Sequence, residues 1–129
     1  MISLLLHSPI DFSRNILQVA VDSEIDFLTD ALDAATHKED KDDYGSRLRT
    51  MNRFKILLET EACVFEFQDE DPSAEHLAMA LEKLIMEQSE IIEDFEGEER
   101  QEIGERIDFG KAMLSALRPN RPEHYGSRH

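Results

Sequence analysis

The chain is poor in cysteine and contains no long hydrophobic run. Cys63 is the single cysteine among 129 residues, so no internal disulfide can form, and no metal-ligand spacing surrounds it. A lone thiol is typical of proteins from reducing compartments. The apolar run at residues 2–6 is short and lacks the preceding positive charges of a signal peptide. No stretch approaches the roughly eighteen apolar residues that span a bilayer. These absences predict a cytoplasmic protein that contacts no membrane.

Basic residues are scarce as well. Lysine and arginine number 14 against 29 aspartates and glutamates, which gives a net charge of −15 and an isoelectric point near 4.6. Surfaces that bind DNA, RNA or anionic membranes are rich in lysine and arginine. We therefore expect no direct nucleic-acid binding. The natural electrostatic partner is a protein with a basic surface, such as a nucleic-acid-binding protein.

The chain does have enough apolar residues to fold. A hydrophobic fraction of 40% separates it from disordered chains, which combine high net charge with low hydrophobicity. Its length suits one domain that buries roughly two-thirds of its unfolded surface. We expect a single helical domain over residues 1–117 and an irregular, proline-containing tail over residues 118–129.

Apolar periodicity predicts an all-α fold, an antiparallel bundle of about four helices. Ser8 and Pro9 look like the cap and first turn of the first helix, Ser23 is a second possible start, and Asp71 caps the third helix. The predicted helices cover residues 9–36, 46–67, 72–95 and 98–117, with a loop at 37–45. Two short runs, 2–6 and 64–67, are rich in β-formers and are alternatively strands.

Acidic residues are densest between residues 90 and 108, where nine carboxylates occupy nineteen positions, and Glu87 lies three residues before this stretch. On a helical wheel, the apolar residues converge on one arc and nearly all these carboxylates point away from it. An outward acidic face suits solvent or a basic partner better than a buried catalytic centre. The acidic residues predicted to bind such a partner are Asp22, Asp26, Asp30, Asp33, Glu87, Glu90, Glu93 and Asp94.

Charge is also segregated along the chain. Residues 1–43 carry a net charge of −7 and residues 68–95 carry −8, whereas residues 44–67 carry +1 and residues 96–129 carry −1. The first and third predicted helices therefore hold most of the negative charge. Such segregation fits either an internal balance across the bundle or a self-complementary surface for dimerisation.

Three glutamates break the outward pattern. Glu24, Glu61 and Glu99 fall on the apolar stripes of the first, second and fourth predicted helices. Inward carboxylates cost free energy unless they are paired or bind a metal, so these three are the candidate metal ligands. The alternative is that they lie near bundle ends or pair with Arg53, Arg106 or a hydroxyl.

Motifs for catalysis are incomplete. E-E-x-x-E at 98–102 and E-x-x-D at 105–108 are patterns that all-α nucleoside triphosphate pyrophosphohydrolases use for magnesium, but here both lie on one helix. The segment 40–45 begins like an EF-hand, yet Met51 stands where a bidentate glutamate is needed. No histidine is predicted near Cys63 to activate its thiol. We expect no catalytic residue and no cofactor.

The first two predicted helices carry more apolar surface than one packing face requires. Either the core absorbs this width, or a second copy of the chain covers it and forms a homodimer. The residues that widen the apolar arcs, and so form the candidate dimer interface, are Ile16, Phe27, Ile56, Cys63 and Phe67.

Taken together, the pattern favours a non-catalytic acidic helical module that binds a basic protein surface, as an inhibitor, an immunity-type protein or an adaptor. Its acidic faces would steer association and could occupy a nucleic-acid-binding groove. Small phage or plasmid anti-defence proteins that imitate DNA share this composition, though no motif. One alternative is a structural subunit that self-assembles through its first two helices. The other is a magnesium-dependent nucleotide hydrolase that uses Glu24, Glu61 and Glu99.

Overall fold

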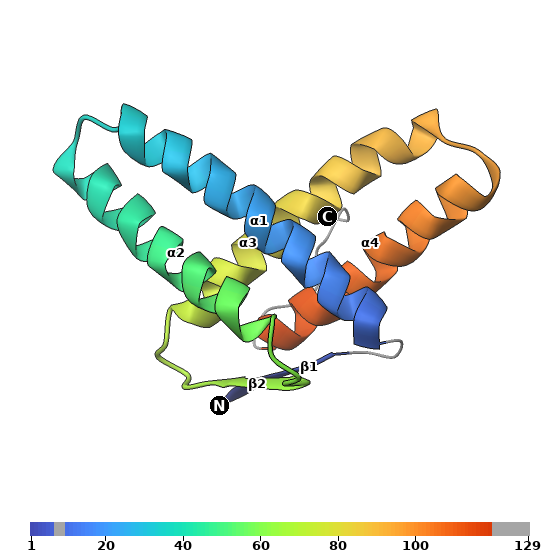
Figure 1. Cartoon of the computed structure of the whole chain (residues 1–129), viewed down its shortest axis with the longest axis horizontal. Coiled ribbons are helices and arrows are strands. Elements are labelled where there is room, and N and C mark those ends of the chain that lie inside the picture. The colour runs from blue at the N-terminus through green and yellow to red at the C-terminus, as the bar shows by residue number, and fades with distance from the viewer. Residues whose placement is uncertain (7–9, 120–129) are drawn as a thin grey trace.

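Two helical hairpins and a small sheet make up the structure (Figure 1). The computed structural model describes residues 1–6 and 10–119. The elements in chain order are β1 (Ile2–Leu5), α1 (Ile10–Ala34), α2 (Lys38–Leu57), β2 (Val64–Phe67), α3 (Ser73–Ile91), the short 3-10 helix η1 (Ile92–Asp94) and α4 (Gly97–Leu117). The predicted all-α class is confirmed, with the sheet as an addition. None of the described helices is long and apolar enough to cross a membrane.

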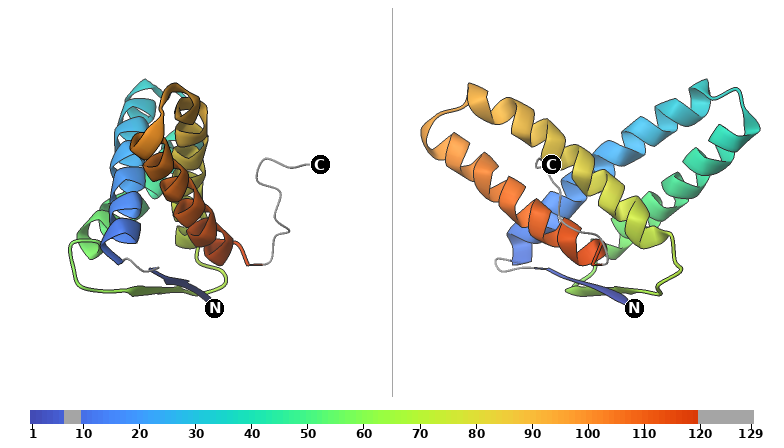
Figure 2. Two further views of the ribbon diagram at one scale, coloured as in Figure 1. Left: turned by 90° about the vertical axis from the view of Figure 1, so that its right-hand side faces the viewer. Right: turned by 180° about the vertical axis from the view of Figure 1, so that it is seen from behind.

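The hairpins α1–α2 and α3–α4 cross near the middle of α1 and α3 and then diverge (Figure 1). Their free ends, at residues 35–37 and 95–96, point away from each other, so the molecule has the shape of a V. Turned sideways, the hairpins form two separate layers with the sheet beneath their crossing (Figure 2). The free half of each hairpin therefore packs mainly against its own partner helix.

The core lies at the crossing and above the sheet, where the four α-helices and the two strands meet. Its fully buried side chains come from both hairpins and from β1. The largest of them are Leu4, Ile16, Leu17, Val21, Leu28, Met51, Leu58, Leu77, Leu81, Met113 and Leu114. Gly110 of α4 permits a close approach, because an added Cβ would lie 3.1 Å from Ile85 Cγ1 on α3.

Helix α2 begins and ends earlier than predicted. Residues 38–45, which are most of the predicted loop 37–45, are helical, so the loop prediction was wrong. Glu39 and Asp40 lie in the first turn, where carboxylates favour the positive end of the helix dipole. The pairs Lys38–Asp42 and Asp43–Arg47 add ion pairs between successive turns.

The chain leaves α2 at Leu57 because several carbonyls find partners outside the helix. The Thr60 hydroxyl donates to the Leu57 carbonyl at 2.6 Å. The Arg14 guanidinium, on α1, donates to the carbonyl oxygens of Leu58, Thr60 and Ala62 at 3.2, 2.8 and 2.8 Å. These bonds hold residues 58–62 out of the helix and lead the chain into β2.

Both runs that were ambiguous between helix and strand are strands. β1 and β2 pair antiparallel, with Leu4 opposite Phe65 and Leu5 opposite Val64. Residues of one face, including Leu4 and Phe65, are buried, whereas Leu5 and Val64 on the other face are exposed. Phe54 of α2 packs on the buried face, with its ring centroid 6.2 Å from that of Phe65.

The remaining boundaries agree with the sequence in part. Helix α1 runs through Asp22 without interruption, so Ser23 starts no second helix. The predicted start at Ser8 and Pro9 and most of the tail, 120–129, lie outside the described residues. Asp71 Oδ1 accepts the Ser73 N–H at 2.8 Å at the start of α3, and this bond keeps the pKa of Asp71 below its usual range. Gly97, with φ of +64°, turns the chain into α4.

Candidate functional site

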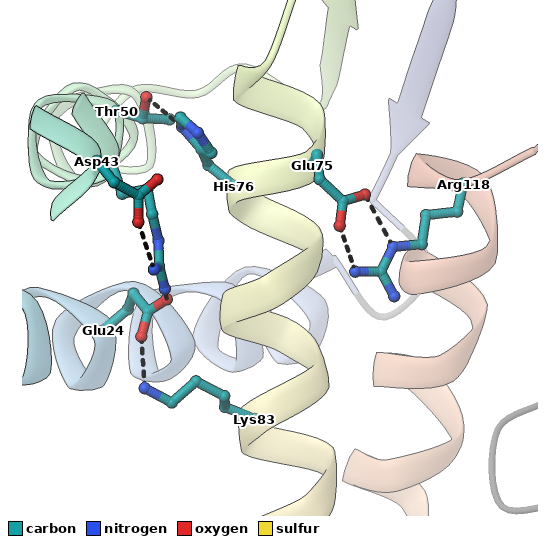
Figure 3. A network of polar contacts seen from close by, with 8 residues as sticks. Glu24, Asp43, Thr50, Glu75, His76, Lys83 and Arg118 are labelled. Atoms are coloured by element: carbon teal, nitrogen blue, oxygen red, sulfur yellow. Dashed lines mark hydrogen bonds and ion pairs between the residues drawn. The ribbon is translucent and has the colours of Figure 1, made fainter. Parts of the chain in front are cut away.

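Glu24 is the one predicted inward glutamate that is buried, with 2% of its surface exposed. Its two carboxylate oxygens bind cations from two other helices (Figure 3). Arg47 Nη2, on α2, lies 3.1 Å from Oε2, and Lys83 Nζ, on α3, lies 2.8 Å from Oε1. A buried carboxylate with two cationic donors is neutralised in place, so Glu24 ties α1 to α2 and to α3 at the crossing.

Lys83 has a second partner at this crossing. Its Nζ lies 3.3 Å from the centroid of the Phe27 ring, in cation–π contact. Arg47 likewise contacts Asp43 at 3.3 Å. Lys83 is therefore held by two residues of α1, and Arg47 by one residue of α1 and one of α2, so the crossing is an electrostatic junction as well as an apolar one.

A second ion-pair group joins the end of α4 to α3. Arg118, 7% exposed, binds Glu75 through two nitrogens at 3.0 and 2.6 Å and Glu82 through a third at 3.1 Å. Burial by itself would lower the pKa of Arg118, but the hydrogen bonds to Glu75 and Glu82 more than offset it and raise the pKa. The bidentate contact fixes the C-terminal end of α4 against α3 (Figure 3).

His76 is a half-buried imidazole beside Thr50, with Nδ1 2.9 Å from the Thr50 hydroxyl oxygen. The Thr50 hydroxyl also lies 3.2 Å from the Ser46 carbonyl, and the tautomer of His76 sets which of these two neighbours receives the hydroxyl hydrogen. Burial, followed by the nearby charge of Arg47, lowers the pKa of His76. The neutral imidazole thus joins α3 to α2 by its hydrogen bond with Thr50.

The structure does not bring the three candidate metal ligands together. Glu61 and Glu99 are exposed, and both inward assignments were wrong. Glu61 lies beyond the end of α2, in the connection to β2, and Glu99 lies in the first turn of α4, close to the free end of its hairpin. Across residues 1–6 and 10–119, no three His, Cys, Asp or Glu side chains are grouped so as to hold a metal ion.

The acidic residues gather on the free ends of the V. We define the first arm as residues 25–46 and the second arm as residues 84–109, the parts of the hairpins beyond the Glu24–Lys83 contact. The first arm has seven acidic and two basic residues (−5), and the second has ten acidic and two basic (−8). These 48 residues thus carry −13 of the net charge of −15, and the other 81 residues carry −2.

Every one of these seventeen arm carboxylates is exposed. Five of them have a side-chain ion pair or hydrogen bond, namely Asp42, Asp43, Glu93, Glu102 and Glu105. Within the described part of the chain, the other twelve have none. The arms therefore present a negative surface that internal cations leave largely uncompensated.

The eight residues predicted to bind a basic partner are all on exposed positions of α1, α3 or η1. Seven of them belong to the arms, and Asp22 lies just below the first arm. Asp22 is 3.5 Å from Lys55, and Glu93 is 3.5 Å from Arg100. Helical periodicity alone was sufficient to place these carboxylates outward.

The five candidate dimer residues divide into three groups. Ile16 is fully buried and Phe67 is 6% exposed, so their assignment to an interface was wrong. Ile16 belongs to the inner stripe of α1, and Phe67 points inward from β2 onto Phe54, 5.6 Å away between ring centroids. Phe27 and Ile56 are exposed, and Cys63 is half-buried.

Sequence analysis missed the cations of the two junctions. Arg47 and Arg118 look like ordinary surface arginines, and the glutamates that they meet on other helices lie 23 to 43 residues away along the chain. Lys83 did carry a signal, as the single basic residue among ten charged residues between positions 68 and 95.

Comparison of the chain with protein-family models, with curated proteins and with solved structures gave no match.

Proposed function

We propose that this protein is a non-catalytic interaction module whose two acidic arms bind a basic protein surface. The observation that carries the proposal is the segregation of charge: −13 on the two arms against −2 on the rest of the chain. A surface charge that served solubility alone has no need to be confined to two diverging ends of the molecule.

The exposed arm carboxylates also suit binding in energetic terms. Twelve of them have no side-chain partner among residues 1–6 and 10–119, so a basic surface can approach without displacing ion pairs of this part of the chain. Clustered charge of one sign raises the rate of encounter with an oppositely charged partner and gives little advantage to a neutral one. The arms would accordingly select basic proteins and act as an inhibitor or an adaptor of their surfaces.

The proposal can be tested by affinity capture. The protein is immobilised through one terminus, and partners are captured from a lysate of its source cells. The arm variant Glu87→Gln/Glu90→Gln/Glu93→Gln/Asp94→Asn removes four charges from the second arm. Its matched control, Asp11→Asn/Glu59→Gln/Glu61→Gln/Glu70→Gln, removes four exposed charges elsewhere. We expect a basic protein to be retained by the wild type and by the control, with an affinity about 10-fold or more lower for the arm variant.

The salt dependence of binding is the second part of the test. Raising the ionic strength from about 0.1 M to about 1 M shortens the Debye length from roughly 10 to roughly 3 Å, so arm-mediated binding should fall steeply. Equal affinity of the two variants for the captured protein, or capture that is insensitive to salt, would contradict the proposal.

A further inference from the structure

The inner and outer helices of the two arms differ in charge. In Figure 1, α1 and α3 border the open side of the V, and α2 and α4 lie outside them. The arm parts of α1, α3 and η1, residues 25–34 and 84–94, contain seven acidic residues and no lysine or arginine. The arm parts of α2 and α4, residues 38–46 and 97–109, contain nine acidic residues and four basic ones. The basic residues of the arms are thus confined to the outer helices.

The exposed apolar side chains of the arms are confined to the inner helices. The large hydrophobic residues that are exposed on the arms are Phe27, Met86 and Ile91, and all three belong to α1 or α3. Phe27 is 46% exposed and Met86 is 59% exposed. Residues 38–46 of α2 and 97–109 of α4 contain no exposed large hydrophobic residue. The inner helices therefore combine unbroken negative charge with apolar surface.

On α3, the contact with α4 defines which residues face the open side of the V. Ile85 faces α4, because its Cγ1 would lie 3.1 Å from a Cβ added to Gly110. Side chains two residues apart on a helix point about 200° apart. Glu87 follows Ile85 by two residues and so points away from α4. Met86 stands in the same relation to Leu84, which is buried.

On α1, the same spacing directs two aspartates away from the packed side of the helix. Leu28 is fully buried, and Asp26 and Asp30 each lie two residues from it. Phe27 faces α3, because Lys83 Nζ lies 3.3 Å from the centroid of its ring. We define the inner face by its exposed residues on α1 and α3, which are Asp26, Phe27, Asp30, Met86, Glu87 and Glu90.

The apolar residues of the inner face lie at its base. Glu24 and Lys83 are in contact at the crossing, with 2.8 Å between Oε1 and Nζ. Phe27 follows Glu24 by three residues and Met86 follows Lys83 by three, so each lies about one turn beyond this contact. Glu90 lies about one turn farther out than Met86. A ligand that reaches the apolar base must therefore pass between acidic side chains.

Charge and apolar surface together select the kind of ligand that fits. A second copy, a nucleic acid or an anionic membrane would bring like charge to the inner face and be repelled. A flat basic surface would meet the free ends at residues 35–37 and 95–96 before it reached the base. A basic amphipathic helix carries apolar side chains on one face and cations beside them, and it is narrow enough to protrude from a protein.

We propose that the inner face binds one basic amphipathic helix of the partner protein between the two arms. Its apolar side chains contact Phe27 and Met86, and its lysines or arginines pair with Asp30, Glu87 and Glu90. The site is part of the proposed function, on which it depends, and it narrows the partner from any basic surface to a basic amphipathic helix.

Two peptides of equal charge test the apolar part of this site. One is a helix of roughly 14 residues built from leucine and lysine, and in the other alanine replaces every leucine. At roughly 0.15 M salt, fluorescence anisotropy should show at least about 10-fold tighter binding of the leucine peptide to the wild type. Phe27→Gln/Met86→Gln should abolish this preference. Its matched control, Ile56→Gln/Val64→Gln, changes two exposed apolar residues outside the arms and should retain it.

Two charge variants test the position of the site. Asp30→Asn/Glu87→Gln/Glu90→Gln removes three charges from the inner face. Asp40→Asn/Glu99→Gln/Asp108→Asn removes three exposed charges from the outer helices of the same arms, so the two variants have equal net charge. We expect the inner variant to bind the leucine peptide at least about 10-fold more weakly than the outer variant.

The outcomes separate this site from the general function. Equal affinity of the wild type for the two peptides, or equal losses in the two charge variants, would overturn the inner-face site. Neither result affects the capture of a basic protein that depends on the arm charges. A wild type that binds neither peptide would likewise overturn the site, whereas the lysate capture decides the general function by itself.

Discussion

Glu24 illustrates how a charged residue can stabilise the interior of this protein. It lies on the apolar stripe of α1, and the direction of its side chain follows from helical periodicity alone. Its partners, Arg47 and Lys83, are 23 and 59 residues away along the chain. Periodicity defines which way a side chain points on its own helix, but not which helix it meets. That is why Glu24 was correctly placed inward and yet assigned to a metal site.

Glu24→Gln is expected to destabilise the fold. The substitution preserves the shape of the side chain but leaves Arg47 and Lys83 without their shared counter-charge, and breaking a buried pair costs roughly 3 kcal/mol or more. Chemical denaturation followed by circular dichroism measures the loss. Glu99→Gln, at an exposed carboxylate, is the control and should change stability by less than about 0.5 kcal/mol. A similarly small change for Glu24→Gln would mean that the junction contributes little.

His76 should make stability depend on pH in a defined window. Because its pKa is lowered in the folded state, the unfolded chain binds the His76 proton more tightly. The contribution of neutral His76 is complete above its ordinary pKa of about 6.5 and is lost as the pH falls below that value. The residues around His76 include Arg47, which opposes protonation, and Asp43, Asp71 and Glu75, which favour it.

The measurement is the free energy of unfolding of the wild type and of His76→Gln between about pH 7.5 and about pH 5. The wild type should lose more stability than His76→Gln as the pH falls below about 6.5. Asp71, whose pKa is also lowered, titrates at lower pH and leaves this window undisturbed. If the free energy of unfolding fell in parallel with pH for the two proteins, His76 would bind its proton equally well in the folded and the unfolded chain.

At the scale of elements, the sequence predicted the number of helices better than their first and last residues. Four apolar periodicities predicted four helices, but α2 is displaced toward the N-terminus by most of its predicted loop. Its charged first turns suggested a loop by composition, although their ion pairs are helical in spacing. The strand identity of residues 64–67 depends on pairing with residues 2–5, a long-range contact that local sequence leaves ambiguous.

Two glycines of α4 provide a matched test of the α3–α4 packing. Gly104→Ala should stabilise the protein by up to about 1 kcal/mol, because the helix gains propensity and the nearest atom, Ile92 Cδ1, is 3.9 Å from the new Cβ. Gly110→Ala should give no gain or a loss of about 1 kcal/mol, because its Cβ would press on Ile85 at 3.1 Å. Thermal or chemical denaturation of both variants measures the difference. If Gly110→Ala stabilised as much as Gly104→Ala, α3 and α4 would be less closely packed than described.

At the scale of the whole molecule, the acidic run that dominates the sequence belongs to one end of a V. Residues 90–108 form the end of α3, η1, the turn at Gly97 and the first half of α4. The sequence could show that these carboxylates face outward. That they lie on a diverging arm, opposite a second acidic arm formed by α1 and α2, follows from the crossing of the hairpins (Figure 1). The crossing depends on the long-range ion pairs and core contacts described above.

Zero-length cross-linking tests the central proposal most directly. A carbodiimide joins carboxylates to lysine amines in contact, so peptides cross-linked to the captured basic partner identify the carboxylates at the interface. We expect these carboxylates to lie in residues 25–46 and 84–109, with Glu87, Glu90 and Asp94 among them. Cross-links that map instead to the acidic residues between 59 and 71, with the arms unmodified, would contradict it.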